Sequence, residues 1–147
     1  MKTPHAHVSL ITLGVSDIPR AAQFYQALGF VRKMKAAGDG VAFFEAGGIV
    51  LSLFGWSDLA HDAGVAGRPQ TDDFRGISIA WNCPAKDDVD AVFTAALKAG
   101  GAPIKAPQQA FWGGYHAFFA DPDGHLWEVA HNPQFSLSLD GKPSLPD

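Results

Sequence analysis

Apolar residues in the first part of the chain recur first at strand spacing and then at helix spacing. A short, mostly branched aliphatic run is followed by Ser16 and Asp17, which can cap a helix. Apolar positions with a helical period come next, and glycines then separate three further apolar runs. The predicted elements are a strand, a helix and three strands, at 8–15, 17–28, 30–36, 40–46 and 49–54. This order is a βαβββ unit.

The same order of elements returns in the second part of the chain. The predicted strand, helix and three strands lie at about 76–81, 87–99, 102–106, 114–120 and 125–130. Residues 42–53 (AFFEAGGIVLSL) also parallel residues 117–129 (AFFADPDGHLWEV), with Ser52 at the position of Glu128. A repeated unit usually packs against its copy. We therefore predict an α+β fold of two βαβββ modules, whose eight strands form a curled mixed sheet around a cleft, with the helices on the outside.

One domain is predicted for the whole chain. With 147 residues, of which 47% are hydrophobic, the chain is long and apolar enough to form its own core. The predicted parts are module 1, a connector, module 2 and a tail, at about 7–55, 56–73, 74–131 and 132–147. The connector is expected to contain a helix from Trp56 to Gly64, capped by Ser57, and then an exposed loop. The tail has three prolines and no sustained period, which indicates an extended, peripheral segment.

Charge and cysteine content limit the classes of partner. The net charge is −4, and the eleven Lys and Arg residues are scattered, so no basic stripe follows a phosphate backbone. Cys83 is the only cysteine, which leaves no internal disulfide to form. No segment approaches the roughly 18 apolar residues of a membrane span, and the first residues lack an apolar signal segment. We therefore expect a cytoplasmic protein that binds neither nucleic acid nor membranes.

Three stretches together resemble a known family. They are a strand leading to Ser16-Asp17 and a helix ending in 24–30 (FYQALGF), a second strand and helix ending in 99–101 (AGG), and a hairpin at 118–128 (FFADPDGHLWE). Over roughly residues 7–132 the chain is similar to the vicinal oxygen chelate superfamily of glyoxalases, bleomycin-resistance proteins and extradiol dioxygenases. The resemblance implies a small-molecule cleft, in many members a divalent metal, and a fold that often forms homodimers.

The metal ligands that the resemblance implies are largely missing. In metal-dependent members, His, Gln or Glu side chains from the first and last strands of each module hold the ion. Glu128 occupies one of the four positions, Ser52 and Leu10 occupy two others, and the fourth falls near Gly76, whose neighbours carry no imidazole or carboxylate. A catalytic divalent ion normally needs about three protein ligands. We therefore predict no metal and no other cofactor, with a divalent ion in an atypical site as the alternative.

His116 and Glu128 are the candidate catalytic residues. If the DPDG turn is a three-residue hairpin loop with Gly124 in the left-handed bulge position, Phe118 faces Glu128 and His116 lies diagonally next to it. The two side chains can then form an acid–base couple. The simpler alternative is a histidine that is only hydrogen-bonded within the sheet. Strand alternation also predicts that Glu128 points into the cleft while its two neighbours face the helices.

Aromatic residues near the predicted cleft indicate the kind of ligand. Trp112 and Tyr115 flank two glycines, in a segment suited to close over a small apolar or planar molecule. The predicted ligand-binding residues are Leu10, Thr12, Ser52, Trp112, Tyr115 and Phe118. We therefore predict a small-molecule-binding protein that works without a metal. The alternatives are a lyase, isomerase or dioxygenase of the same fold, using an atypical metal site or acid–base chemistry at Glu128, and a scaffold domain without a ligand.

Overall fold

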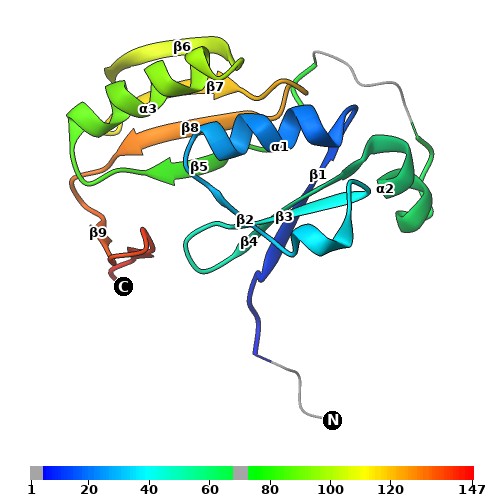
Figure 1. Cartoon of the computed structure of the whole chain (residues 1–147). Helices are drawn as coiled ribbons and strands as arrows, with labels where there is room; N and C mark the ends of the chain where they lie inside the picture. Colours follow the sequence, from blue (N-terminus) through cyan, green and yellow to red (C-terminus); the bar gives the residue numbers. More distant parts are fainter. Residues whose placement is uncertain (1–4, 68–72) are drawn as a thin grey trace.

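Module 1 forms a four-stranded mixed sheet and one helix (Figure 1). The computed structural model describes residues 5–67 and 73–147. The elements of module 1 are β1 (Leu10–Val15), α1 (Ile18–Ala27), β2 (Val31–Lys33), β3 (Val41–Glu45) and β4 (Val50–Gly55). The strand order is β1-β4-β3-β2, in which β1 runs parallel to β4 and the other neighbours are antiparallel. Helix α1 packs on β2, β3 and β4, as the predicted βαβββ unit requires.

Module 2 repeats this arrangement. Its elements are β5 (Ile79–Asn82), α3 (Lys86–Lys98), β6 (Ala102–Gln109), β7 (Tyr115–Ala120) and β8 (Leu126–His131). The strand order is β5-β8-β7-β6, and β5 is parallel to β8 just as β1 is to β4. Helix α3 lies across β6, β7 and β8 (Figure 1). The predicted α+β fold of two βαβββ modules is confirmed, with the eight strands divided between two four-stranded sheets.

One hydrophobic core joins the two modules. Strand alternation turns one face of each sheet toward the helices, so that Phe44 of β3 and Trp127 of β8 both enter the core. Tyr25 of α1 lies between the sheets, with its ring centroid 6.1 Å from that of Phe44 and 5.8 Å from that of Trp127. Because Tyr25 is fully buried by these contacts, α1 holds the two modules together rather than covering its own sheet alone.

Several element boundaries and one helix cap differ from the prediction. Strand β5 begins at Ile79 rather than at about residue 76, and β6 continues to Gln109 rather than ending at about residue 106. Strand β2 is shorter than expected because Met34 adopts a left-handed φ of 53° and begins a short 3-10 helix, η1 (Lys35–Ala37). Helix α2 (Trp56–Ala63) forms as predicted, but Gly55 is its N-cap and no side chain caps it, so the expected capping by Ser57 is wrong. The predicted connector also includes residues 68–72, which lie outside the described residues. No helix in the described ranges has the length and apolar character needed to cross a membrane.

The tail folds back onto module 1, which corrects the prediction of a merely extended segment. Strands β9 (Ser136–Leu137) and β10 (Pro143–Ser144) form a short antiparallel hairpin. A Cβ atom at Gly47 would overlap the carbonyl oxygen of Asp140, and one at Gly48 would overlap the side chain of Lys142. The hairpin therefore lies directly on the β3–β4 turn, where only glycines leave room. The tail sequence does not indicate this contact because its partner lies about ninety residues earlier.

Candidate functional site

The β7–β8 hairpin positions the two candidate catalytic residues. Gly124 adopts a left-handed φ of 82°, as the predicted three-residue loop requires. The resulting register places Phe118 opposite Glu128 and His116 opposite Ala130. Facing residues of an antiparallel pair share a sheet face, so these four side chains lie on the same side of module 2. The predicted register is confirmed.

The side of β8 that carries Glu128 is the side away from the core. Trp127 and Val129 are 4% and 0% exposed and belong to the core, whereas the Glu128 side chain is 23% exposed. The alternation of β8 is as predicted for these three residues, whereas a cleft in front of Glu128 stays a prediction, because the cavity described below is lined by Trp127 and not by Glu128. The Glu128 side chain is therefore partly accessible to solvent.

His116 and Glu128 are in direct contact. The Nδ1 atom of His116 lies 2.6 Å from Oε2 of Glu128, and His116 is 6% exposed. Since an ionised carboxylate only accepts, Nδ1–H donates in this bond. The other ring nitrogen, Nε2, has no hydrogen-bond partner within the described residues, so it is the atom of this pair that can meet a ligand.

Two aromatic rings surround the imidazole of His116. The ring centroids of Trp112 and Phe118 lie 5.4 Å and 5.2 Å from that of His116, both at steep interplanar angles. A Cβ atom at Gly114 would overlap the Trp112 indole and would lie 2.6 Å from the His131 carbonyl oxygen. A glycine at this position is therefore what allows the indole to lie against the start of β7.

Tyr115 does not join this group, contrary to its place in the predicted site. It precedes His116 on β7, so alternation turns it to the opposite face, where its hydroxyl donates to Asp90 of α3 at 2.7 Å. That hydrogen bond raises the pKa of the Tyr115 hydroxyl. Phe111, in the same glycine-flanking segment, is fully exposed. Of the predicted aromatic segment, only Trp112 contacts the His116 ring.

The candidate residues of module 1 share one face of their own sheet. Thr12 pairs with Ser52 in the β1–β4 register, and Leu10 precedes Thr12 by two residues. Leu10 is 42% exposed, whereas Ser52 is 3% exposed. These residues lie on a different sheet from His116 and Glu128. The predicted site therefore draws its residues from both sheets, and their convergence on one ligand stays a prediction.

The donors on these faces do not fit a divalent metal. Glu128 offers a single carboxylate, which is already bound to His116, and the corresponding positions of module 1 hold Leu10 and Ser52. Within residues 5–67 and 73–147, no group of three or more His, Cys, Asp or Glu side chains could hold a metal ion. An ion held by one carboxylate and one imidazole falls short of the usual set of about three protein ligands.

The DPDG turn has a structural role that the sequence did not reveal. Asp121 Oδ1 accepts hydrogen bonds from the backbone N–H groups of Asp123 and His125, each at 2.9 Å. Asp121 Oδ2 accepts from the Tyr25 hydroxyl at 2.6 Å, and that hydroxyl accepts from Trp127 Nε1 at 3.0 Å. Burial raises the pKa of both Tyr25 and Asp121. The motif that carries the family resemblance therefore fastens α1 to the β7–β8 hairpin.

A second set of contacts joins the same turn to β1 and the start of α1. Asp123 Oδ1 accepts from the backbone N–H and the hydroxyl of Ser16, both at 2.9 Å. His125 Nε2 donates to the Gly14 carbonyl at 2.7 Å, while its Nδ1 lies 3.0 Å from a guanidinium nitrogen of Arg75. His125 is thus a buried link between modules rather than a ligand-binding residue.

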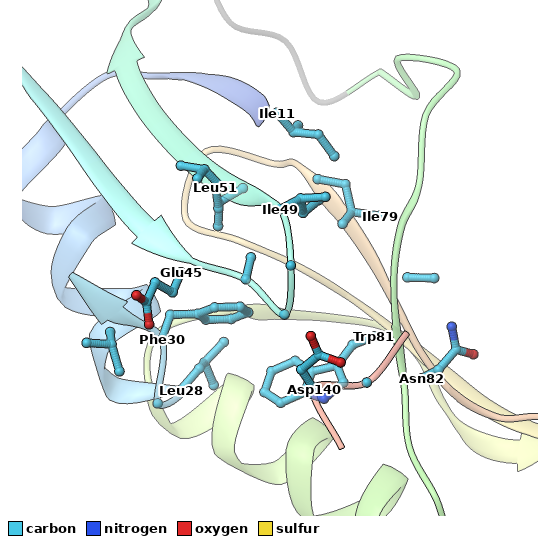
Figure 2. Close-up of a pocket in the computed structure, with 18 of the residues that line it drawn as sticks. Ile11, Leu28, Phe30, Glu45, Ile49, Leu51, Ile79, Trp81, Asn82 and Asp140 are labelled. Atoms are coloured by element: carbon cyan, nitrogen blue, oxygen red, sulfur yellow. The ribbon is translucent and has the colours of Figure 1, made fainter. Parts of the chain in front are cut away.

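A cavity of about 1100 Å³ opens between the two modules on the side of the sheets that faces the core (Figure 2). Its large apolar lining residues are Ile11, Leu28, Phe30, Ile49, Leu51, Ile79, Trp81 and Trp127. Its polar lining residues include Glu45, Asn82 and Asp140. None of the predicted site residues lines this cavity. The strand aromatics Trp81 and Trp127 were a signal for it, but only the packing of one module on the other creates the space.

Comparisons with known proteins place the chain in a family. The model of the Glyoxalase/Bleomycin resistance protein/Dioxygenase superfamily matches residues 6–129. Among solved structures, a glyoxalase-related enzyme from Fulvimarina pelagi is 30% identical, with a TM-score of 0.86 over 96% of this chain and 99% of that chain. A search of curated proteins found no match.

More distant structures share the fold. A glyoxalase/bleomycin resistance protein/dioxygenase family enzyme from Burkholderia phytofirmans PsJN is 20% identical, with a TM-score of 0.76 over 86% of this chain and 98% of that chain. Lactoylglutathione lyase from Agrobacterium tumefaciens is 23% identical, with a TM-score of 0.65 over 88% and 96%. With the two βαβββ modules and the family match over most of its length, the chain belongs to the glyoxalase/bleomycin resistance protein/dioxygenase superfamily.

Proposed function

We propose that the chain binds a small apolar or planar molecule without a metal. The molecule would lie on the face of β7 and β8 that carries His116, Phe118 and Glu128, which we call the β7–β8 face. The observation that carries this proposal is the contact between His116 and Glu128 beside the rings of Trp112 and Phe118. The two rings provide flat apolar surface, and His116 Nε2 provides one hydrogen-bonding atom. This combination suits a planar ligand with a single polar group.

Metal independence is tested by thermal unfolding in the presence of Ni²⁺, Mn²⁺, Fe²⁺ or Zn²⁺. A ligand at a hundred times its dissociation constant stabilises the folded state by about 2.7 kcal/mol, which a thermal shift detects easily. We expect no stabilisation that depends on Glu128, since its carboxylate is bound to His116. A metal-induced shift that disappears in Glu128→Gln would refute this part of the proposal.

A gain-of-function variant tests the placement of the module 1 residues. Leu10→His and Ser52→Glu, combined, would put an imidazole and a carboxylate on one face of the β1–β4 pair. We expect a larger metal-induced thermal shift than in the unsubstituted chain, because the two new donors and Glu128 together make up the usual set of about three protein ligands. An unchanged shift in the folded variant would show that these side chains do not converge.

An acid–base enzyme is the second candidate, and the same pair of residues favours it. Glu128 would hold His116 Nδ1–H, as the 2.6 Å distance allows, and leave Nε2 to take a proton from a substrate and return it. No oxidant or metal is needed for such an exchange. The 30% identical structure from Fulvimarina pelagi is described as a glyoxalase-related enzyme, which supports this candidate.

A double-mutant cycle separates these functions from a purely structural pair. His116→Gln and Glu128→Gln are measured singly and together for binding of quinoline and naphthalene probes. A functional pair gives a coupling energy of about 0.5–3 kcal/mol, whereas additive effects would end the case for joint action. The acid–base enzyme candidate is tested with hydroxyacetone in D₂O. NMR measures how fast the protons on the carbon next to its carbonyl group exchange with solvent. Exchange above the buffer rate that is lost in His116→Gln would favour catalysis over binding alone.

A further inference from the structure

The cavity between the modules is separate from the β7–β8 face. Trp127 lines it, while Glu128, the next residue of β8, points to the opposite side of the sheet. Ile11 and Ile79 come from β1 and β5, the edge strands of the two sheets, and both pack against the core. The cavity is therefore an open extension of the hydrophobic core, and any molecule in it would contact both modules at once.

We propose that this cavity is a second binding site, which takes a small, neutral and largely apolar molecule. Its volume of about 1100 Å³ lies slightly above the range of about 300–1,000 Å³ that is usual for small-molecule pockets, so a small molecule fits in it with room to spare. Figure 2 shows Ile11, Ile49, Leu51 and Ile79 together at one end. An aliphatic end of this kind favours the apolar part of a ligand over water.

The opposite end of the cavity is aromatic and offers a hydrogen-bond donor. The ring of Phe30 lies 5.4 Å from that of Trp81 and 5.9 Å from that of Trp127 between centroids, so the three rings form a corner. The Trp127 indole donates to the Tyr25 hydroxyl. In the described ranges the Trp81 indole donates to no protein acceptor, which leaves its N–H available to a ligand that carries an acceptor.

The charges at the mouth of the cavity cancel, which favours a neutral ligand. Glu45 lies 3.8 Å from Lys33, and Asp140 lies 3.8 Å from Lys142. Each carboxylate thus has a cation beside it, so the mouth presents neither an excess of negative charge for a cation nor an excess of positive charge for an anion. The remaining polar lining side chain is the amide of Asn82, which is uncharged.

The C-terminal hairpin forms one wall of this site. Residues 139–141 and Pro143 line the cavity, and the hairpin lies on the Gly47–Gly48 turn of module 1. Asp140 of this hairpin and Trp81 of β5 both line the cavity, and both are labelled in Figure 2. The tail runs from β8 of module 2 to the Gly47–Gly48 turn of module 1. It therefore bounds the cavity between the modules on one side.

The test is binding of N-phenyl-1-naphthylamine, a neutral apolar dye whose emission rises in apolar surroundings. Ile49→Trp would fill the aliphatic end, and we expect it to weaken dye binding at least tenfold. Ile104→Trp is the matched control, because Ile104 lies on β6, is 57% exposed and does not line the cavity. Unchanged affinity in Ile49→Trp would overturn the proposal. If Ile49→Trp unfolds, Ile79→Phe, which fills the same end from the other module, replaces it with the same expected result.

Phe118→Ala distinguishes this site from the one under the proposed function. Phe118 belongs to the β7–β8 face and does not line the cavity, so Phe118→Ala should leave unchanged the part of the dye binding that Ile49→Trp removes. If Phe118→Ala loses dye binding while Ile49→Trp binds the dye with unchanged affinity, the dye lies on the β7–β8 face. That result would overturn the second site and leave the proposed function intact. Sedimentation of the same samples gives the last outcome: a dimer that excludes the dye would identify the cavity as an interface between copies and refute the proposal.

Discussion

Removal of the Tyr25 hydroxyl tests whether the DPDG turn holds the two modules together. Tyr25 is fully buried, donates to Asp121 Oδ2 at 2.6 Å and accepts from Trp127 Nε1 at 3.0 Å. Tyr25→Phe keeps the ring and leaves both partners without this bond inside the core. A hydrogen bond to a charged group contributes about 1.5–3 kcal/mol, and an unsatisfied buried donor costs about 1 kcal/mol or more. We expect the free energy of unfolding to fall by about 2–4 kcal/mol.

The chain contains a matched control for this measurement. Its other tyrosine, Tyr115, also donates to an aspartate, Asp90 at 2.7 Å, but this bond lies at the surface. Tyr115→Phe should therefore change the free energy of unfolding by about 0.5 kcal/mol or less. Urea unfolding followed by tryptophan fluorescence and circular dichroism measures both variants, and Tyr25→Phe should also lower Tm by roughly 5–15 °C. Equal effects of the two substitutions would refute the proposed role of the Asp121 contact.

Two further predictions concern the thiol and the Trp112 loop. Burial raises the pKa of the Cys83 thiol from 9.0 to about 11, with a smaller contribution from the Asp88 carboxylate, so its contribution to stability is complete below about pH 9 and is lost as pH rises toward 11. Disulfide exchange with Ellman's reagent at pH 8 should be slow until urea unfolds the chain, and rapid reaction of the folded protein would contradict this. Gly114→Ala should cost about 1–3 kcal/mol because the added methyl group overlaps the Trp112 indole. Gly40→Ala, where nothing lies within 4 Å, is the control and should change the free energy of unfolding by less than about 0.5 kcal/mol in unfolding experiments.

The hairpin around Glu128 shows which structural features the local sequence alone can predict. The turn residues and the alternation of apolar positions were enough to predict that Phe118 faces Glu128 and that His116 can contact it, and both are observed. Strand register and face follow from turn length and a period of two, which involve residues that are neighbours in the chain. Tyr115 shows the limit of that approach: its glycine-flanked segment suggested a binding loop, but its position next to His116 placed it on the α3 side.

By itself, the sequence determined the order of the elements, the repeat of the two βαβββ modules and the register of the β7–β8 hairpin, because short-range periodicity and turn chemistry specify these. Only the tertiary structure decided how the modules meet. The bond from Tyr25 to Asp121 joins residues 96 positions apart, and the tail reaches the Gly47–Gly48 turn across a similar span. Contacts of this kind, and the cavity that they border, depend on the shapes of two folded surfaces, which no pattern within either segment encodes.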